Sequence, residues 1–69
     1  MKIKNKIAPE QRQCVSLIKQ ARRKGHTLEQ MAVSLGVSFS TVSRWENGRV
    51  VPHRNTSIRL VPLLKELVA

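Results

Sequence analysis

A chain of 69 residues has room for one small domain, whose thin core leaves it only marginally stable. Its 13 lysines and arginines against four glutamates give a net charge of +9, which favours a polyanion such as nucleic acid as the partner. The single Cys14 excludes an internal disulfide and fits a reducing, cytoplasmic compartment.

Several classes of function are excluded by what the sequence lacks. No apolar run approaches the roughly 20 residues of a membrane span, so we expect no membrane association. The chain has no Asp or Tyr, no Gly-rich phosphate loop and no complete Cys/His or Ser/His constellation. We therefore expect no enzymatic activity and no cofactor, and no small-molecule ligand is indicated. His26 and His53 lack the spacing of metal ligands, so both are expected at the surface and no metal site is expected.

The basic residues flank a nearly neutral centre. Arg44 is the only cation between residues 26 and 48, whereas both flanks are rich in Lys and Arg. Flanks that hold phosphates around a centre that touches bases would have this layout, because phosphate contacts supply affinity and base contacts supply sequence preference. A basic surface that serves only solubility is the alternative. We expect residues 1–8 to form a basic N-terminal arm, either tracking DNA or disordered, and residues 9–69 to form the domain.

The first predicted element is a helix over residues 9–24. Pro9 suits a first helical turn, and Gly25 ends the helix after a run of cations. Its apolar residues fall on one stripe, formed by Cys14, Leu17, Ile18 and Ala21. No strand alternation is found anywhere in the chain, so we expect an all-α fold.

Residues 27–47 predict two short helices joined by a tight turn. Thr27 begins a capping box, and Gly36 ends the first helix with a positive φ. Ser38 caps the second helix, which ends at Asn47 and Gly48. The residues expected to face inward are Leu28, Met31, Ala32, Leu35, Val42 and Trp45.

After a loop over residues 49–56, the tail is predicted either as a helix that kinks at Pro62 or as a helix that starts near Val61 with Pro62 in its first turn. A broken pair of helical pieces is favoured over one straight helix. A helix from about Ser57 would contain Pro62, which removes a hydrogen bond and crowds the preceding turn. The apolar residues expected near one face are Ile58, Val61, Leu64 and Val68. This tail either covers the domain's own core or pairs with a second copy of the chain.

The second short helix has an outward face that consists of Phe39, Ser40, Ser43, Arg44 and Asn47. Such a face fits the DNA major groove, which admits one helix. Arg44 can bond a guanine through two donors, the serines can bond several bases, and Phe39 can contact a thymine methyl. The alternatives are that the hydroxyls face only solvent, that Arg44 binds phosphate or a Glu, and that Phe39 folds onto the helix.

The stretch GHTLEQMAVSLGVSFSTVSRWENG, residues 25–48, resembles the helix-turn-helix of the phage-repressor family, which includes lambda repressor, Cro and many small bacterial regulators. The marks are LGVS, VSRWENG and the spaced Thr27, Ala32 and Gly36. The resemblance implies a four- to five-helix bundle whose helix-turn-helix spans residues 27–47, with helix 38–47 in the major groove. It also implies a homodimer on a near-palindromic operator, in a bacterial or phage-encoded protein associated with the nucleoid.

The resemblance and the positions beside the motif together predict two sets of DNA-contacting residues. The set at base edges is Phe39, Ser40, Ser43 and Arg44, and the set at phosphates is Thr27, Leu28, Ser38, Thr41, Asn47, Arg49 and Arg54. At Leu28 many members have Gln, so this contact falls to Thr27 and the free N–H groups of its helix. At Ala21 many members have an Arg that pairs with the residue equivalent to Glu46, which here pairs with Arg22 or stays solvated.

The function expected from these features is sequence-specific binding of double-stranded DNA by a transcriptional regulator, most simply a repressor that occupies an operator. One alternative is an antitoxin-like or other protein-interaction module whose DNA binding is secondary. The other is nonspecific DNA architecture. Salt distinguishes specific binding from architecture, because only a specific protein keeps its preference for one site as salt rises.

Overall fold

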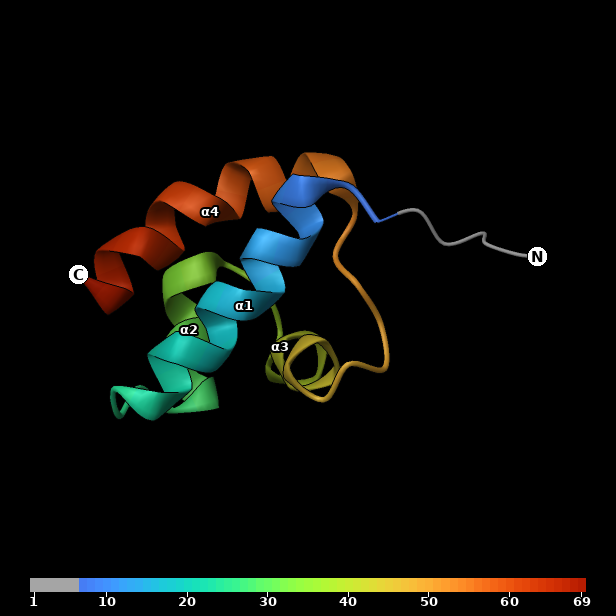
Figure 1. The fold of residues 1–69 in the computed structure, drawn as a ribbon. Coiled ribbons are helices and arrows are strands. Elements are labelled where there is room, and N and C mark those ends of the chain that lie inside the picture. The colour runs from blue at the N-terminus through green and yellow to red at the C-terminus, as the bar shows by residue number, and fades with distance from the viewer. Residues whose placement is uncertain (1–6) are drawn as a thin grey trace.

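The computed structural model describes residues 7–69 and contains four helices and no strand within them (Figure 1). The helices are α1 (Pro9–Arg23), α2 (Leu28–Leu35), α3 (Phe39–Glu46) and α4 (Arg54–Val68). The expected all-α class is confirmed. Of the expected basic arm, only Ile7 and Ala8 belong to the described residues, and the rest lies outside them. None of the four helices is long and apolar enough to cross a membrane.

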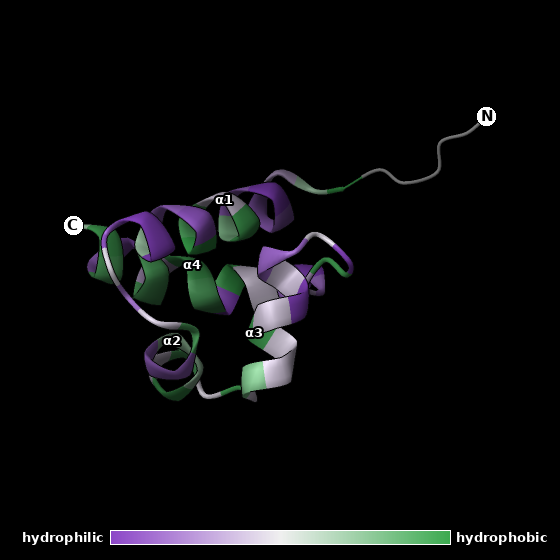
Figure 2. Cartoon of the chain, turned by 90° about the horizontal axis from the view of Figure 1, so that it is seen from below, coloured by the Kyte–Doolittle hydropathy of each residue, from purple (hydrophilic) through white to green (hydrophobic). Residues whose placement is uncertain are grey.

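Helices α1 and α4 make the most extensive contact of any two helices. They begin at the same end of the molecule and lie along each other (Figure 1). The shorter α2 and α3 pack on one side of this pair, and α3 points across it (Figure 2). Every helix contributes to one core, which contains Cys14, Leu17, Ile18, Ala21, Met31, Ala32, Leu35, Val42, Trp45, Leu60 and Leu64. The apolar stripes predicted for residues 9–47 are therefore confirmed, with Leu28 packing at the margin of the core.

The ends of the first three helices follow their local sequence signals. The Thr27 hydroxyl accepts from the Gln30 N–H at 3.0 Å, and the Gln30 side chain accepts from the Thr27 N–H at 3.0 Å, which completes the capping box. Gly36 ends α2 with a φ of +72°, a conformation that costs glycine no steric penalty. The predicted start at Pro9 is also correct, and Gln11 closes that end by accepting from the Ala8 N–H at 2.8 Å.

The tail is one helix, so the predicted pair of helical pieces is wrong. α4 begins at Arg54, three residues earlier than expected, and continues through Pro62. The proline leaves the carbonyl of Ile58 without its helical partner, but Ile58 lies at the surface, where water can bond that carbonyl. Leu60 and Leu64 are fully buried on the core side of α4. Their burial, worth about 1.5–3 kcal/mol each, offsets the cost of an interior proline, which is about 3 kcal/mol.

The predicted register of this tail was also partly wrong. Ile58 was expected on the core face, yet 49% of it is exposed, and Leu60 occupies the core instead. The buried face of α4 is instead formed by Ser57, Leu60 and Leu64, which are three and four positions apart. The Ser57 hydroxyl is accommodated there because it donates to the His53 carbonyl at 3.0 Å. The remaining expected residues, Val61, Leu64 and Val68, do contact the core.

Candidate nucleic-acid interface

Helix α3 has one buried face and one exposed face. Val42 is fully buried and Trp45 is 7% exposed, so both anchor the helix in the core. On the other face Ser40 and Arg44 are exposed, and Phe39 is 51% exposed. Side chains three and four positions apart share a helix face, so the exposed residues form one continuous stripe. Phe39 therefore lies on the outward face and is not folded into the core.

The tight turn before α3 fixes where this helix begins. The Val37 N–H donates to the Ala32 carbonyl at 3.0 Å, which closes the turn around Gly36. Ser38 then caps α3 by accepting from the Thr41 N–H at 3.2 Å. The start of α3 is thus set by backbone geometry within a few residues of α2, and its direction follows from that of α2.

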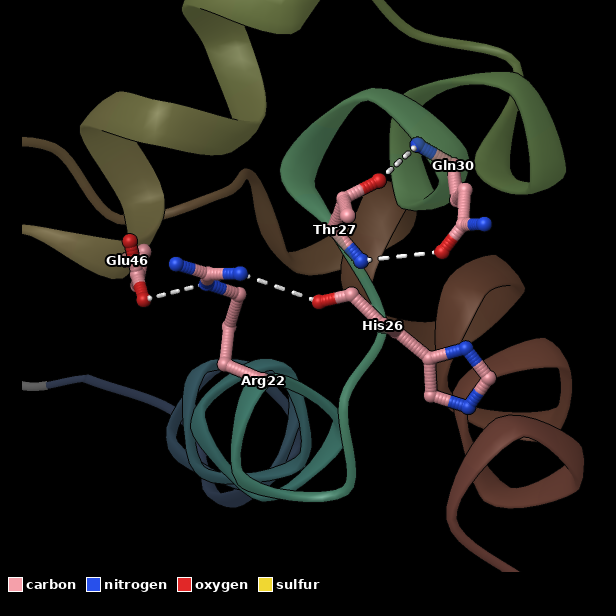
Figure 3. A network of polar contacts seen from close by, with 5 residues as sticks. All are labelled: Arg22, His26, Thr27, Gln30 and Glu46. Atoms are coloured by element: carbon pink, nitrogen blue, oxygen red, sulfur yellow. Dashed lines mark hydrogen bonds and ion pairs between the residues drawn. The ribbon is translucent and has the colours of Figure 1, made fainter.

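The other end of α3 is held by an ion pair (Figure 3). The Arg22 Nε of α1 donates to the Glu46 Oε2 at 3.0 Å. The same guanidinium donates through Nη1 to the His26 carbonyl at 3.0 Å. Pairing of Glu46 with Arg22, one of the two predicted alternatives, is therefore confirmed. Arg22 connects the end of α3 to the segment that leads into α2.

His26 is half-buried, so its predicted place at the surface is wrong, whereas His53 is exposed as expected. The His26 Nε2 lies 2.8 Å from the carbonyl oxygen of Leu67 in the last turn of α4. Because a carbonyl oxygen only accepts, Nε2 carries the proton of this hydrogen bond. We call residues 22–27 the junction, because they connect all four helices. Arg22 of α1 bonds Glu46 of α3, His26 bonds Leu67 of α4, and Thr27 caps α2.

The N-terminus of α2 has polar groups free to bind an anion. The Thr27 hydroxyl oxygen is used by the Gln30 N–H, but its own proton has no acceptor within residues 7–69. The first N–H groups of a helix, here those of Leu28 and Glu29, have no intrahelical partner. The Leu28 side chain is half-buried against the core, so only its backbone is suited to a phosphate.

Ser38 and Thr41, two of the residues predicted to contact phosphates, are hydrogen-bonded to each other at the start of α3. Ser38 and Thr41 hydroxyl oxygens lie 2.8 Å apart, and either one can donate to the other. Two hydroxyls carry two protons and their mutual bond uses one, so one proton remains for a phosphate oxygen. Ser38 is exposed and Thr41 is half-buried, which favours Ser38 as that donor.

The remaining predicted residues do not all lie near α3. Asn47 and Arg49 are exposed directly after it, and Ser43 is half-buried on it. Arg54 starts α4 beside the N-terminus of α1, on the side of the molecule away from α3 (Figure 1). Its Nε lies 3.8 Å from the Glu10 Oε1, a long exposed pair of little energetic weight. A phosphate contact by Arg54 stays a prediction, and it would compete with Glu10.

The charge of the α3 face comes from Arg44 alone. Glu46, the other charged residue of α3, is neutralised by Arg22, whereas neither salt bridge of residues 7–69 involves Arg44. The ribbon of α3 is mostly pale in Figure 2, in contrast to the hydrophilic turns of α1. No three His, Cys or Glu side chains of the described residues cluster as metal ligands would. The exposed face of α3 offers the hydroxyl groups of its serines, the exposed ring of Phe39 and the unpaired guanidinium of Arg44.

In a comparison with known protein families, a model described as Helix-turn-helix matches residues 18–64. The chain belongs to the lambda repressor-like helix-turn-helix family. Members of this family are DNA-binding regulators and are typically not enzymes, so double-stranded DNA is the partner of this helix-turn-helix protein. The four-helix bundle is the fold that the family predicts. No match was found among curated proteins or among solved structures.

Two residues with structural roles were missed in the sequence of this helix-turn-helix protein. The Gln11 amide donates to the Pro52 carbonyl at 2.8 Å, and His26 bonds Leu67 at the same distance. Each bond joins residues 41 positions apart, so no local pattern could indicate it. Arg12, Lys19 and Arg23 recur at helical spacing on α1, a signal that the net charge alone does not express.

Proposed function

We propose that the protein is a sequence-specific transcriptional repressor that recognises the major groove of its operator with residues 38–47. The observation that carries this proposal is the division of α3 into a buried face with Val42 and Trp45 and an exposed face with Ser40 and Arg44. A helix anchored on one side and free on the other can enter a groove as a rigid unit. The base-contacting residues we propose are Phe39, Ser40, Ser43 and Arg44.

The shape and chemistry of the exposed face support major-groove binding. A helix with its side chains is about 10–12 Å wide, and the major groove is about 12 Å wide, so small side chains allow close approach. Ser40 and Ser43 are small, and Arg44 is long and unpaired within residues 7–69. An Arg fork matches the two acceptors on the guanine edge, and an exposed Phe suits a thymine methyl. These features favour base contacts over phosphate contacts for this face.

Groups on both sides of α3 would hold the DNA backbone. The Thr27 hydroxyl and the N–H groups at the start of α2 suit one phosphate, because the positive end of a helix attracts anions. Asn47 and Arg49 are exposed after α3 and suit the opposite strand. Phosphate contacts of this kind fix position and supply affinity, and they carry no sequence preference.

The proposal includes a homodimer on a near-palindromic operator in the cytoplasm, associated with the nucleoid of a bacterium or encoded by a phage. Apolar side chains on the outer surface of α4 support self-association, since Ile58 is 49% and Leu63 38% exposed. In such a dimer the two copies of α3 would lie about 34 Å apart, one turn of the duplex. Each half of the operator would then meet one α3.

Selection of binding sites from a randomised duplex pool tests this proposal, with the size of the complex measured by sedimentation. We expect one enriched near-palindromic sequence and two protein chains on each duplex. Arg44→Ala should cost about 1–3 kcal/mol on the selected site and relax the preference at one base position. Arg49→Ala, the matched change outside α3, should weaken the selected and scrambled duplexes alike.

Two results would contradict the proposal. Equal effects of Arg44→Ala and Arg49→Ala on both duplexes would show that α3 makes no base contact. If raising the salt concentration removed both the affinity for DNA and the preference for the selected site, the protein would be a nonspecific architectural DNA-binding protein. An antitoxin-like module is the remaining alternative, and it would bind a protein partner with full strength after Arg44→Ala.

A further inference from the structure

The outer face of α1 carries a groove of about 360 Å³ that contains no residue of α2 or α3. Val15 and Val51 are half-buried and form its floor, with Ile7 at one end. The exposed side chains of Arg12, Lys19 and Arg23 stand along its rim. An apolar floor with a cationic rim is a different chemical surface from the nearly neutral face of α3.

Gln11 gives this groove a fixed wall. Its side-chain amide accepts from the Ala8 N–H and donates to the Pro52 carbonyl, each at 2.8 Å. Pro52 is buried and follows Val51 directly, so the loop after α3 is tied to the first turn of α1. A groove that is already formed costs less to occupy, because little side-chain or loop freedom is lost on binding.

The rim cations are not used by the fold. Neither of the salt bridges within residues 7–69 involves Arg12, Lys19 or Arg23, and no acidic residue lines the groove. Lys19 and Arg23 are one turn apart on α1, and Arg12 lies two turns before Lys19. At 1.5 Å per residue the row is about 16 Å long. Like charges held this close repel one another, and an anionic partner of similar length would relieve that repulsion.

We propose that this groove binds an acidic amphipathic helix of about three turns from a partner protein. Apolar side chains of that helix, spaced three and four positions apart, would cover the floor, and its carboxylates would pair with the rim. A nucleic-acid strand would satisfy the cations but would place sugar and phosphate over an apolar floor, so the floor favours a peptide. This inference does not depend on the proposed repressor function. None of the residues proposed to contact DNA lines the groove, so the peptide site is separate from the proposed DNA-binding residues.

A synthetic peptide of 15 residues, with leucines on one helical face and glutamates on the other, is a suitable probe. We would titrate it into the isotope-labelled full chain and follow the backbone amides by NMR. The amides of Val15, Ser16 and Lys19 should shift and saturate, and those of Ser40 and Arg44 should not. A second peptide with lysine in place of each glutamate should cause no saturable shift.

Two charge-reversal variants separate the groove from general electrostatics. Lys19→Glu removes a rim cation, and Lys65→Glu makes the same charge change on the exposed surface of α4. Lys19→Glu should weaken the acidic peptide roughly tenfold, and Lys65→Glu by less than about twofold. Val15→Ser should weaken it several-fold without any change of charge. Circular dichroism of each variant checks that the fold is retained.

Three outcomes would overturn the inference. Equal weakening by Lys19→Glu and Lys65→Glu would show attraction by net charge alone. Saturable shifts confined to α2 and α3 would place the acidic peptide on the DNA-binding face. Weakened binding of duplex DNA by Lys19→Glu, with the peptide unaffected, would assign the rim to nucleic acid. Failure of the repressor proposal would show separately, as loss of site selection with peptide binding unchanged.

Discussion

Replacing Arg22 by methionine tests whether the junction holds α3 in place. Methionine retains much of the aliphatic length of arginine and removes both donors, the Nε bonded to Glu46 and the Nη1 bonded to the His26 carbonyl. The variant leaves the core residues unchanged. We expect a lower free energy of unfolding, because the end of α3 and the turn before α2 both lose a tether.

The size of the effect follows from the exposure of the partners. The Arg22 and Glu46 side chains are 39% and 24% exposed, so their ion pair is screened by solvent and is worth about 0.2–1 kcal/mol. The hydrogen bond to the His26 carbonyl contributes about 1 kcal/mol more. The expected loss is therefore about 1–2 kcal/mol, and each kcal/mol lowers the Tm of a domain of this size by about 4–8 °C.

Urea unfolding followed by the fluorescence of Trp45 measures this loss directly. Trp45 is the only tryptophan of the chain and lies in the core, so its emission reports on the packing of α3. Arg23→Met is the matched control, since Arg23 occupies the next position of α1, is exposed, and has a side chain that makes no hydrogen bond or salt bridge within residues 7–69. Its stability should stay within about 0.5 kcal/mol of the parent.

A double-mutant cycle with Glu46→Gln isolates the ion pair from the bond to His26. We expect a coupling energy of about 0.5 kcal/mol between Arg22 and Glu46, with the rest of the loss present in Arg22→Met alone. Equal stabilities of Arg22→Met and Arg23→Met would refute the reasoning. Water would then replace the contacts of the guanidinium at no cost, and α3 would be held by its buried face alone.

Three further variants test the fold and the site. Pro62→Ala should raise the free energy of unfolding by about 1–3 kcal/mol in a urea titration, because alanine restores the N–H donor for the Ile58 carbonyl at an exposed position. An unchanged free energy would mean that Pro62 does not strain the helix backbone of α4. Burial raises the pKa of the Cys14 thiol above its ordinary value, and the nearby Ser57 side chain offsets only part of that rise. The unfolded state therefore loses this proton first, stability should fall as pH rises above about 9, and Cys14→Ala should reduce that slope in chemical unfolding measured from pH 7 to 10. Leu28→Gln should tighten DNA binding several-fold in fluorescence anisotropy by adding a phosphate donor beside Thr27, and unchanged affinity would show that no phosphate lies there.

The helix boundaries up to residue 47 could be predicted because their signals are local. The capping box at Thr27, the positive φ of Gly36 and the apolar stripe of α1 each depend on residues within a few positions of one another. The same periodicity separates the buried and exposed faces of α3. Such signals predict the same helices in any fold in which the apolar side of each helix can pack against a core.

The tail could not be predicted in the same way, because its structure depends on tertiary packing. Pro62 taken alone argues for a break, and only the burial of Leu60 and Leu64 against the rest of the core reverses that conclusion. The register of α4 likewise depends on Ser57, a residue whose burial is not typical of its type. Local propensity was overridden by contacts between distant segments.

The candidate site shows the same division between local and distant information. Exposure of Arg44 follows from helical periodicity, whereas the ion pair of Glu46 with Arg22 needed the crossing of α1 and α3 to be known. The sequence offered this pairing only as one of two alternatives. Contacts with bases and phosphates depend on a partner that lies outside the chain, so they remain proposals.

The junction also limits how this small protein can be re-engineered. An exposed turn with a glycine, such as the one at Lys24 and Gly25, is ordinarily a tolerant place to insert residues. Here an insertion of even one residue would shift Arg22 relative to His26 and Thr27. The ion pair of Arg22 with Glu46 of α3 could then no longer form together with the Thr27 cap of α2 and the hydrogen bond of His26 to Leu67 of α4. Fusion partners or tags are therefore better attached beyond the chain ends than between α1 and α2.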